Sequence, residues 1–424
     1  MTGRGSRRRF LRLGATAVVG TAVAGTAGTV LRSQAREVER WDPATTRIRG
    51  ANYIPAQAYN VFQMWTDYAP DVVERDIGYA RDLRLNALRV FLSFERWREA
   101  PDAHEQWFEH LVESAVEEDL RILPVLFDTV GMAPTEKRLY DRDPLTATGV
   151  HSPRGTIVSN PNRWGAPRSF VKWFMERYRD DPRLLAIDVA NEPGVQRDPV
   201  DRLRFAREMF KTAAEERGET PLTVGNVYLK NSRFFTDLGV DVFQFHNNFP
   251  SSTGAIQQAL QGGVEMKRAL EKPVWISEWQ RLRPGGSGWN AELAEDEWQP
   301  AYRSLASTVR SGGLNGDFFW SLMLKPAYLR PQRMRGTLTG VFHEDGAVWS
   351  LDDARAIAGG DFEAEERQEW PEWAEPVYTE YVLGDPDDDE VGVGSGASSE
   401  EEEETEEKEG ASNRITAPRS RLGF

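Results

Sequence analysis

Cysteine is absent from the 424-residue sequence, which excludes a disulfide framework, thiolate metal sites, a cysteine nucleophile and a cysteine-linked lipid anchor. Any chemistry must therefore use oxygen and nitrogen groups. Positive charge is also in short supply, because 52 Lys and Arg stand against 67 Asp and Glu and the net charge is -15. This balance disfavours non-specific binding to nucleic acid or to an anionic membrane surface.

Long apolar runs are missing except for one near the start, Gly14 to Leu31, which is rich in Gly, Ala and Thr. The basic stretch Ser6 to Arg12 precedes it, and the small residues Ser33 to Ala35 follow it. This order resembles a twin-arginine export signal, so we expect residues 1–35 to be a signal peptide read by the twin-arginine export machinery. The protein would then be secreted or lie at the extracellular surface, with no stable membrane insertion after processing. An uncleaved anchor is the alternative, since 18 residues approach the length of a membrane span.

The far end of the chain is poor in apolar residues. From Asp385 to Gly410 there are 13 acidic residues and one Lys, interleaved with Gly and Ser. Such a segment cannot form a core, so we predict a disordered acidic tail over 385–424 and a single domain over 36–384. Only 8 of the 52 basic residues are Lys, and this acidic, Lys-poor composition resembles that of proteins from salt-loving archaea.

The middle of the chain alternates short apolar runs with longer amphipathic segments, such as 72–85 and 105–120, where apolar residues recur at helical spacing. Eight runs are candidate strands: Ile48 to Ile54, Ala87 to Phe94, Ile122 to Phe127, Leu185 to Ala190, Leu222 to Val227, Val240 to His246, Val274 to Glu278 and Asp317 to Leu322. This alternation predicts a parallel sheet with crossover helices. Eight units over about 280 residues favour an α/β fold of the (β/α)8 TIM-barrel type over an open, doubly wound sheet.

Polar residues close most of these strands, at the end where barrel enzymes carry their active sites. Among them are Glu192 after the fourth strand and Glu278 in the seventh, which face each other across an eight-stranded barrel. A carboxylate at the end of an apolar strand is costly unless it is used or paired. Two carboxylates about 5 to 5.5 Å apart suit a retaining glycoside hydrolase, whereas about 6.5 to 9.5 Å would suit an inverting one. A structural ion pair with a neighbouring Arg is the alternative for either Glu.

Taken in order, these strand ends resemble glycoside hydrolase family 5, the cellulase and mannanase family of clan A. The resemblance rests on Arg89 in the second strand, Asn191-Glu192-Pro193 after the fourth, His246 in the sixth, Glu278 in the seventh and Trp320-Ser321 in the eighth. It extends from Arg49 to about Gly359, and the segments Gly50 to Pro55, Met64-Trp65 and Val341 to Gly346 add to it.

The resemblance implies a retaining β-glycoside hydrolase in which Glu192 is the acid/base and Glu278 the nucleophile. Arg89 would lower the pKa of the nucleophile, and Asn191 would hydrogen-bond the sugar 2-hydroxyl. His246 would position or polarise the catalytic pair, and Trp320 would form the floor under the sugar. Tyr53 and Trp65 are further candidates for substrate contact. No metal and no organic cofactor is implied.

The chain departs from the family pattern at two positions. The family usually has a Tyr two residues after the strand-six His, where this chain has Asn248. The amide could reorient the nucleophile, or Tyr53 or Tyr228 could supply the hydroxyl instead. The family also commonly has a His near the end of the third strand, where this chain has Asp128; His151 on the following loop is a possible replacement or an ordinary loop residue.

The substrate is a carbohydrate in every version of this hypothesis. Among the 14 Trp, those placed on loops or strand ends are candidate sugar platforms: Trp65, Trp97, Trp164, Trp279 and Trp289. A β-mannan, a β-glucan and a short β-glycoside all fit, with endo or exo action. The alternatives are a non-catalytic carbohydrate-binding protein on a decayed barrel and a transglycosylase. A metal-dependent hydrolase is disfavoured, since only one of the five His is placed at a strand end.

Overall fold

The computed structural model describes residues 38–194, 199–284 and 298–383. The predicted signal peptide, the predicted acidic tail and the candidate platform Trp289 lie outside the described residues. All helices and strands described below belong to one compact unit, which begins at Glu39.

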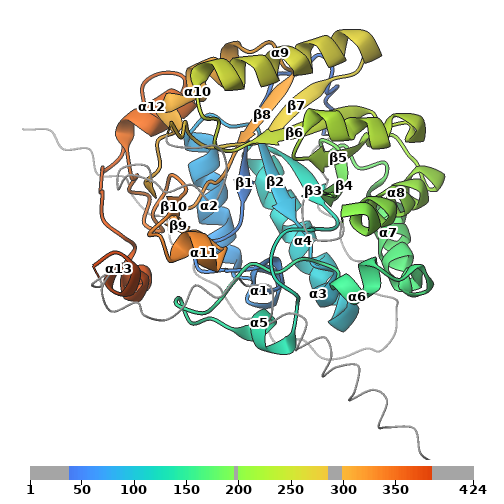
Figure 1. Cartoon of the computed structure of the whole chain (residues 1–424), viewed down its shortest axis with the longest axis horizontal. Coiled ribbons are helices and arrows are strands. Elements are labelled where there is room, and N and C mark those ends of the chain that lie inside the picture. Colours follow the sequence, from blue (N-terminus) through green and yellow to red (C-terminus); the bar gives the residue numbers. More distant parts are fainter. Residues whose placement is uncertain (1–37, 195–198, 285–297, 384–424) are drawn as a thin grey trace, which may run out of the picture. The chain divides into compact units, whose positions relative to one another are not determined.

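Eight parallel strands form a closed barrel in the order β1 to β8, and β8 pairs with β1 (Figure 1). The strands are β1 (Ile48–Tyr53), β2 (Ala87–Phe91), β3 (Arg121–Val125), β4 (Ile187–Asn191), β5 (Leu222–Asn226), β6 (Val242–Asn247), β7 (Val274–Trp279) and β8 (Gly316–Phe319). All eight predicted strands are present, and the predicted (β/α)8 TIM-barrel fold is confirmed.

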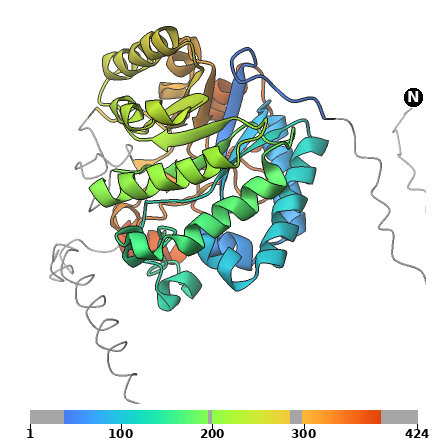
Figure 2. The ribbon, with the colours of Figure 1, turned by 90° about the vertical axis from the view of Figure 1, so that its right-hand side faces the viewer.

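Helices cover the outside of the barrel, as the turned view shows (Figure 2). The described α-helices are α1 (Val61–Thr66), α2 (Pro70–Asp82), α3 (Phe94–Glu99), α4 (Pro101–Glu117), α5 (Glu136–Tyr140), α6 (Gly155–Val158), α7 (Gly165–Tyr178), α8 (Pro199–Glu215), α9 (Thr253–Leu270), α10 (Ala306–Ser311), α11 (Arg330–Arg333), α12 (Leu351–Ala358) and α13 (Glu375–Tyr381). Between β5 and β6 the described connection consists of 3-10 turns, Leu229–Phe234 and Thr236–Leu238, instead of an α-helix.

The helix starts differ from the predicted ones because proline sets them. Helices α2 and α4 begin two and four residues before the predicted starts, at Pro70 and Pro101. Proline suits the first helical turn, since its fixed φ is helical and its missing N–H would have had no partner there. Both helices then bury one apolar stripe, which in α4 includes Phe108, Leu111 and Val112.

Most of the core belongs to two clusters. The smaller of these consists of residues in the strands or just before them: Ile48, Ala87, Leu123, Leu185, Ala186, Val242, Trp275 and Phe318. The larger cluster joins residues of the strands to the apolar faces of the surrounding helices. Apolar side chains thus pack along the strands, while Asn191, His246 and Glu278 lie toward the carboxyl ends of β4, β6 and β7.

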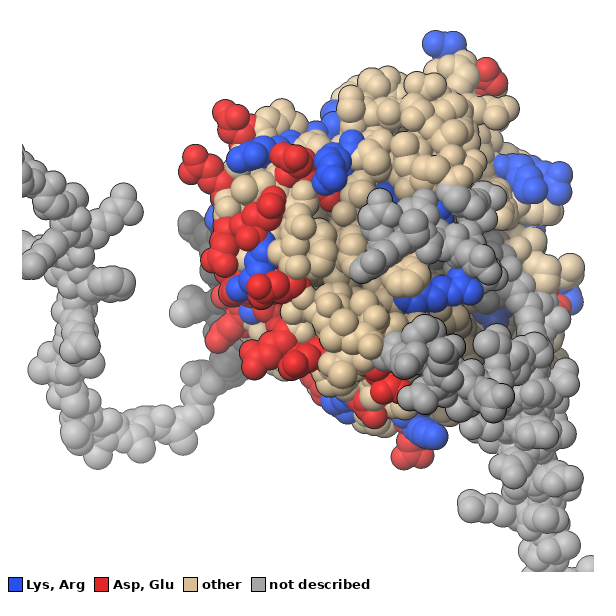
Figure 3. Space-filling model, turned by 60° about the vertical axis from the view of Figure 1, so that its left-hand side comes forward, with Lys and Arg blue, Asp and Glu red and all other residues tan. Residues whose placement is uncertain are grey.

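Acidic and basic side chains alternate over part of the face shown in Figure 3. Ion pairs at the surface of the molecule include Arg142 with Asp67 and Arg207 with Asp237. Within the described ranges, no helix is both long enough and apolar enough to cross a membrane.

Candidate active site

Glu192 and Glu278 meet at the carboxyl ends of β4 and β7. Glu278 lies within β7 and is 5% exposed, whereas Glu192 directly follows β4. One carboxylate oxygen of each lies within 4.8 Å of the other. The backbone of Glu192 has a φ of 51°, in the left-handed region, and its N–H donates to the carbonyl of Gly225 (2.7 Å). Non-glycine residues in this region are uncommon and concentrate at functional sites.

Arg89 on β2 lies at the centre of the barrel and is fully buried. Its Nη1 donates to Glu278 Oε1 (2.9 Å) and to Asn52 Oδ1 (3.0 Å). Its Nη2 donates to Asn191 Oδ1 (2.7 Å), and both Nη2 and Nε donate to Asp188 Oδ2. The planar guanidinium therefore fixes the nucleophile candidate and the amide beside the acid candidate in one hydrogen-bonded network.

A glycine makes room for this network. A Cβ on Gly225 of β5 would lie 2.6 Å from Arg89 Nη2 and 3.0 Å from Asp188 Oδ2. Asp188 also accepts from the Gly225 N–H (2.9 Å) and from Gln244 Nε2 (3.3 Å). Asp188 thus neutralises part of the Arg89 charge inside the barrel, where an unpaired charge would be costly.

The two glutamates have different environments. Burial raises the pKa of Glu192 to about 7, and Arg89 opposes this only in part. Burial also raises the pKa of Glu278, but His246, Arg89 and a hydrogen bond from Asn248 Nδ2 to Oε2 (3.0 Å) favour its ionised form. The expected contribution of Arg89 is therefore present, although burial outweighs it. Glu278 accepts hydrogen bonds from Arg89 and Asn248 that favour the ionised form, as a nucleophile requires, and burial favours the protonated form of Glu192, as a general acid requires.

His246 on β6 connects the two carboxylates. Its Nδ1 lies 2.7 Å from Glu192 Oε1 and 3.6 Å from Glu278 Oε1. Burial lowers the pKa of His246 to about 4, so the imidazole is neutral. The short contact with Glu192 therefore contains one proton, carried either by the ring or by the carboxyl group. If Glu192 is protonated, its hydroxyl donates to Nδ1 and the ring carries its own proton on Nε2; if Glu192 is ionised, Nδ1–H donates to it, so a neutral ring can pair with Glu192 in either state.

The structure also brings three residues to the site that the sequence interpretation did not assign to it. Asp128, just beyond β3, accepts from Asn191 Nδ2 (2.9 Å), and burial raises its pKa to about 7. Tyr328 packs against Trp320 with ring centroids 5.5 Å apart, and burial, with smaller contributions from Asp128, Glu278 and Glu192, raises its pKa. Asp188 could have been found as a lone charge in an otherwise apolar strand, whereas no sequence signal marks Tyr328.

The structure places the side chains of several predicted substrate contacts in the core. Tyr53 is fully buried and donates from its hydroxyl to Asp76 Oδ2 (3.0 Å), and Trp65 is fully buried with its Nε1 donating to the Phe91 carbonyl (2.8 Å). Trp164 donates through Nε1 to the carbonyls of Ile157 and Val158 and packs on Phe205, Trp279 is 0% exposed, and Trp97 packs against the core.

The structure shows the surroundings of Tyr228, Asn248 and His151, the residues at or near the positions where the chain departs from the family pattern. Tyr228 is 55% exposed, so it does not supply a hydroxyl to the buried Glu278. Asn248 itself makes the contact with Glu278. The buried His151 is in contact through Nδ1 with the carbonyl of Pro153 (2.9 Å), while Asp128 lies in the network around Asn191.

Glu192, His246 and Glu278 could also hold a metal ion, since one ligand atom from each lies within 4.8 Å of the others. However, Arg89 donates to Glu278 Oε1, and its positive charge at this oxygen opposes the binding of a cation. The arrangement is better suited to carbohydrate hydroxyl groups, which can both donate and accept hydrogen bonds.

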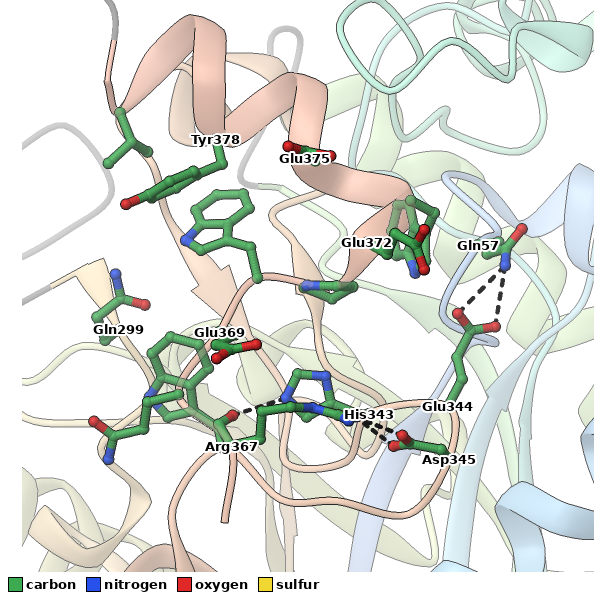
Figure 4. A pocket seen from close by; sticks show the side chains of 16 residues that line it. Gln57, Gln299, His343, Glu344, Asp345, Arg367, Glu369, Glu372, Glu375 and Tyr378 are labelled. Carbon is green, nitrogen blue, oxygen red and sulfur yellow. Dashed lines mark hydrogen bonds and ion pairs between the residues drawn. The ribbon is translucent and has the colours of Figure 1, made fainter. Parts of the chain in front are cut away.

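A separate hollow of about 1230 Å³ lies between the loops after β1 and β8 and the segment around α13 (Figure 4). Gln57 donates to Glu344, and Arg367 donates to Asp345 along its wall. It shares no lining residue with the glutamate pair. Two of its lining residues, Gln299 and Val382, are close in sequence to the ranges 285–297 and 384–424, which lie outside the described residues.

Comparison with known proteins gives structural neighbours only. No protein-family model matches the chain, and no curated protein matches it. Among solved structures, an exo-β-1,4-mannosidase from Opitutaceae bacterium strain TAV5 is 19% identical with a TM-score of 0.55, covering 76% of this chain and 60% of that one. These neighbours are glycoside hydrolases.

Two further neighbours are GH5_18 proteins. One, from Bifidobacterium longum in complex with Manβ1-4GlcNAc, is 15% identical with a TM-score of 0.55 and covers 74% of this chain and 77% of that one. The other, from Streptomyces cattleya in complex with GlcNAc, is 15% identical with a TM-score of 0.52 and covers 76% and 83%. At these identities the shared feature is the barrel fold. The chain spans less than two thirds of the mannosidase.

Proposed function

We propose that the protein is a retaining β-glycoside hydrolase. The observation that carries the proposal is the pair Glu192 and Glu278, whose nearest carboxylate oxygens lie within 4.8 Å at the ends of β4 and β7. This short separation suits direct nucleophilic attack, because an inverting pair leaves room for a water molecule between the second carboxylate and the sugar.

The roles follow from the environments of the two groups. Glu278, held by Arg89 and Asn248, attacks the anomeric carbon, while Glu192 donates its proton to the leaving oxygen as the glycosidic bond breaks. A glycosyl ester on Glu278 results. Glu192, now ionised, takes a proton from water, the water oxygen attacks the anomeric carbon, and Glu278 leaves as a carboxylate. Forming the ester removes a negative charge near Glu192, which lowers its pKa and fits it for the second step.

The residues around Glu192 and Glu278 fit a sugar bound at the scissile bond. Asn191 lies beside Glu192 and bridges Arg89 and Asp128, so its amide is fixed for contact with the 2-hydroxyl. Trp320 is 7% exposed and, together with Tyr328, offers an aromatic surface for the C–H face of a pyranose. For the substrate, we propose a β-linked glucoside or mannoside. A β-1,4-mannoside is the first to test, because one structural neighbour is an exo-β-1,4-mannosidase.

The test is sugar release by the full chain in molar salt from β-mannans, β-glucans and aryl β-glycosides. Glu278→Gln should lower the rate by at least about a thousandfold, because the nucleophile is lost. Glu192→Gln should impair poor leaving groups far more than activated aryl groups, which need no proton. NMR should show the β-anomer as the first product. An α-anomer first, or equal activity in parent and Glu278→Gln, would refute the proposal.

Two further predictions from the sequence, on export and on salt adaptation, accompany this proposal. We propose export by the twin-arginine route, supported by the basic stretch from Ser6 to Arg12 and the apolar run after it, and adaptation to high salt, supported by the acidic composition.

A product longer than the substrate, formed when an oligosaccharide acceptor is added, would indicate a transglycosylase. Sugar binding without turnover would indicate a non-catalytic binding protein.

A further inference from the structure

The ends of β6 and β7 carry two pairs of polar side chains that face each other. His246 and Glu278 are partners in the strand register, and Asn248 and Gln280 follow two residues later on the same face of each strand. The backbone continues the pairing beyond the strands, since the Arg281 N–H donates to the Asn248 carbonyl (3.2 Å). All four side chains are buried, at 3 to 9% exposure.

Side-chain hydrogen bonds join three of these residues into a chain. Gln280 Nε2 donates to Asn248 Oδ1 (3.3 Å), and Asn248 Nδ2 donates to Glu278 Oε2 (3.0 Å). An ionised carboxylate can only accept, so Asn248 must turn its amide nitrogen toward Glu278. Its oxygen then needs a donor, and Gln280 supplies one. The contact from Gln280 therefore selects the amide orientation in which Asn248 serves the nucleophile.

The hydrogen bonds from Gln280 through Asn248 act on Glu278 Oε2, the carboxylate oxygen that Arg89 does not contact. Arg89 donates to Oε1 of Glu278, whereas Asn248 donates to Oε2. With one donor on each oxygen, the carboxylate cannot rotate about its last bond without losing a hydrogen bond. Loss of the second donor would release the carboxylate and weaken the stabilisation of its charge.

We propose that Asn248 and Gln280 are positioning residues that hold Glu278 in its reactive orientation, with Gln280 acting only through Asn248. The inference rests on the proposed glycosidase function, since it assigns Glu278 as the nucleophile. It explains how this chain supports the nucleophile with an amide, and it gives a role to Gln280, for which the sequence analysis had none.

The pKa of Glu278 reports on this support. The charged and titratable groups that act on Glu278 come from several sides of the site: Arg89 on β2, Asp128 after β3, Glu192 after β4, His246 on β6 and Tyr328 after β8; Asp188 on β4 acts on Arg89 and His246. None of them is changed in the variants below, so a shift reflects the amide chain.

The experiment uses the full chain with Asn248→Leu, Gln280→Met and the double variant. Infrared spectroscopy over a pH series measures the pKa of Glu278, with its carboxyl band assigned by its absence in Glu278→Gln. We expect Asn248→Leu to raise this pKa by about one unit, because a hydrogen bond to the charged form is lost. Gln280→Met should raise it less. On a cleaved aryl glycoside, kcat should fall about tenfold to a hundredfold in Asn248→Leu, with KM little changed.

The double variant decides whether Gln280 acts through Asn248. The pKa of Glu278 and the kcat of the double variant should equal those of Asn248→Leu alone, because Gln280 no longer has the Asn248 amide to hydrogen-bond. A further effect of Gln280→Met in the Asn248→Leu background would overturn the proposal. The matched control is Gln261→Met on α9, an exposed Gln that donates to Glu265 (3.0 Å) and should change neither quantity.

The two proposals fail in different ways. If the infrared shifts occur but no glycoside is cleaved by the parent, the hydrogen-bond chain is confirmed and the glycosidase function is wrong. If the parent cleaves a glycoside and Asn248→Leu changes neither the pKa of Glu278 nor kcat, the positioning role is wrong. Folding of each variant is checked by its thermal transition.

Discussion

Replacement of Arg89 by Met should destabilise the protein strongly, because it leaves two carboxylates in the barrel without their counter-charge. Arg89 is fully buried and pairs with Asp188, which is 0% exposed, and with Glu278. Removing one partner of a buried ion pair costs about 3 to 5 kcal/mol. The lost hydrogen bonds to the neutral Asn52 and Asn191 add about 1 kcal/mol each. We therefore expect a total loss of about 5 to 7 kcal/mol.

Equilibrium denaturation at low and at molar salt measures this loss. The buried pair is screened little, so the loss should be nearly the same at both salt concentrations. Arg142→Met is the matched surface control, since Arg142 and its partner Asp67 are both about half exposed; its cost should be at most about 1 kcal/mol and should shrink with salt. A loss below about 1 kcal/mol in Arg89→Met would refute the view that Arg89 balances the buried charge.

Three further predictions concern Glu192, Gly225 and Tyr53. Activity should fall as pH rises through about 7, because Glu192 must hold a proton and its pKa is raised to about 7. The stability that protonated Glu192 contributes is complete below the pKa of this group in the unfolded chain and is lost as pH rises through 7. Glu192→Gln should therefore unfold at a higher temperature than the parent at pH 8. Gly225→Ala should lower the free energy of unfolding by about 1 to 3 kcal/mol and remove most of the activity, because its Cβ would lie 2.6 Å from Arg89 Nη2. The control is Gly165→Ala, which has no atom within 4 Å of the added Cβ and should change this free energy by less than about 1 kcal/mol. Tyr53→Phe should lower stability by about 1 to 3 kcal/mol, since a buried carboxylate loses its donor, and should leave KM unchanged; a raised KM would return Tyr53 to the substrate site.

The prediction of the barrel succeeded because a strand buried on both faces requires a continuous apolar run. The runs at 48–54 and 274–278 became β1 and β7 almost without change. The same logic indicated the site, since polar residues that end apolar strands must gather at one mouth when the sheet closes. It could not tell which way a side chain points at the strand end. Tyr53 closes β1 but turns outward to Asp76 on α2.

The sequence by itself determined the number of strands, the closed barrel and the meeting of Glu192 with Glu278, because strand periodicity and barrel closure are set by local apolar pattern and chain order. Only the tertiary structure decided the electrostatics. The pKa of Glu278 depends on burial as well as on Arg89, and burial is a property of the packed molecule. The contact between Gln280 and Asn248 likewise depends on the register of β6 and β7, which the shift between Phe245 and His246 sets. A one-residue change in that register would turn these side chains away from the site.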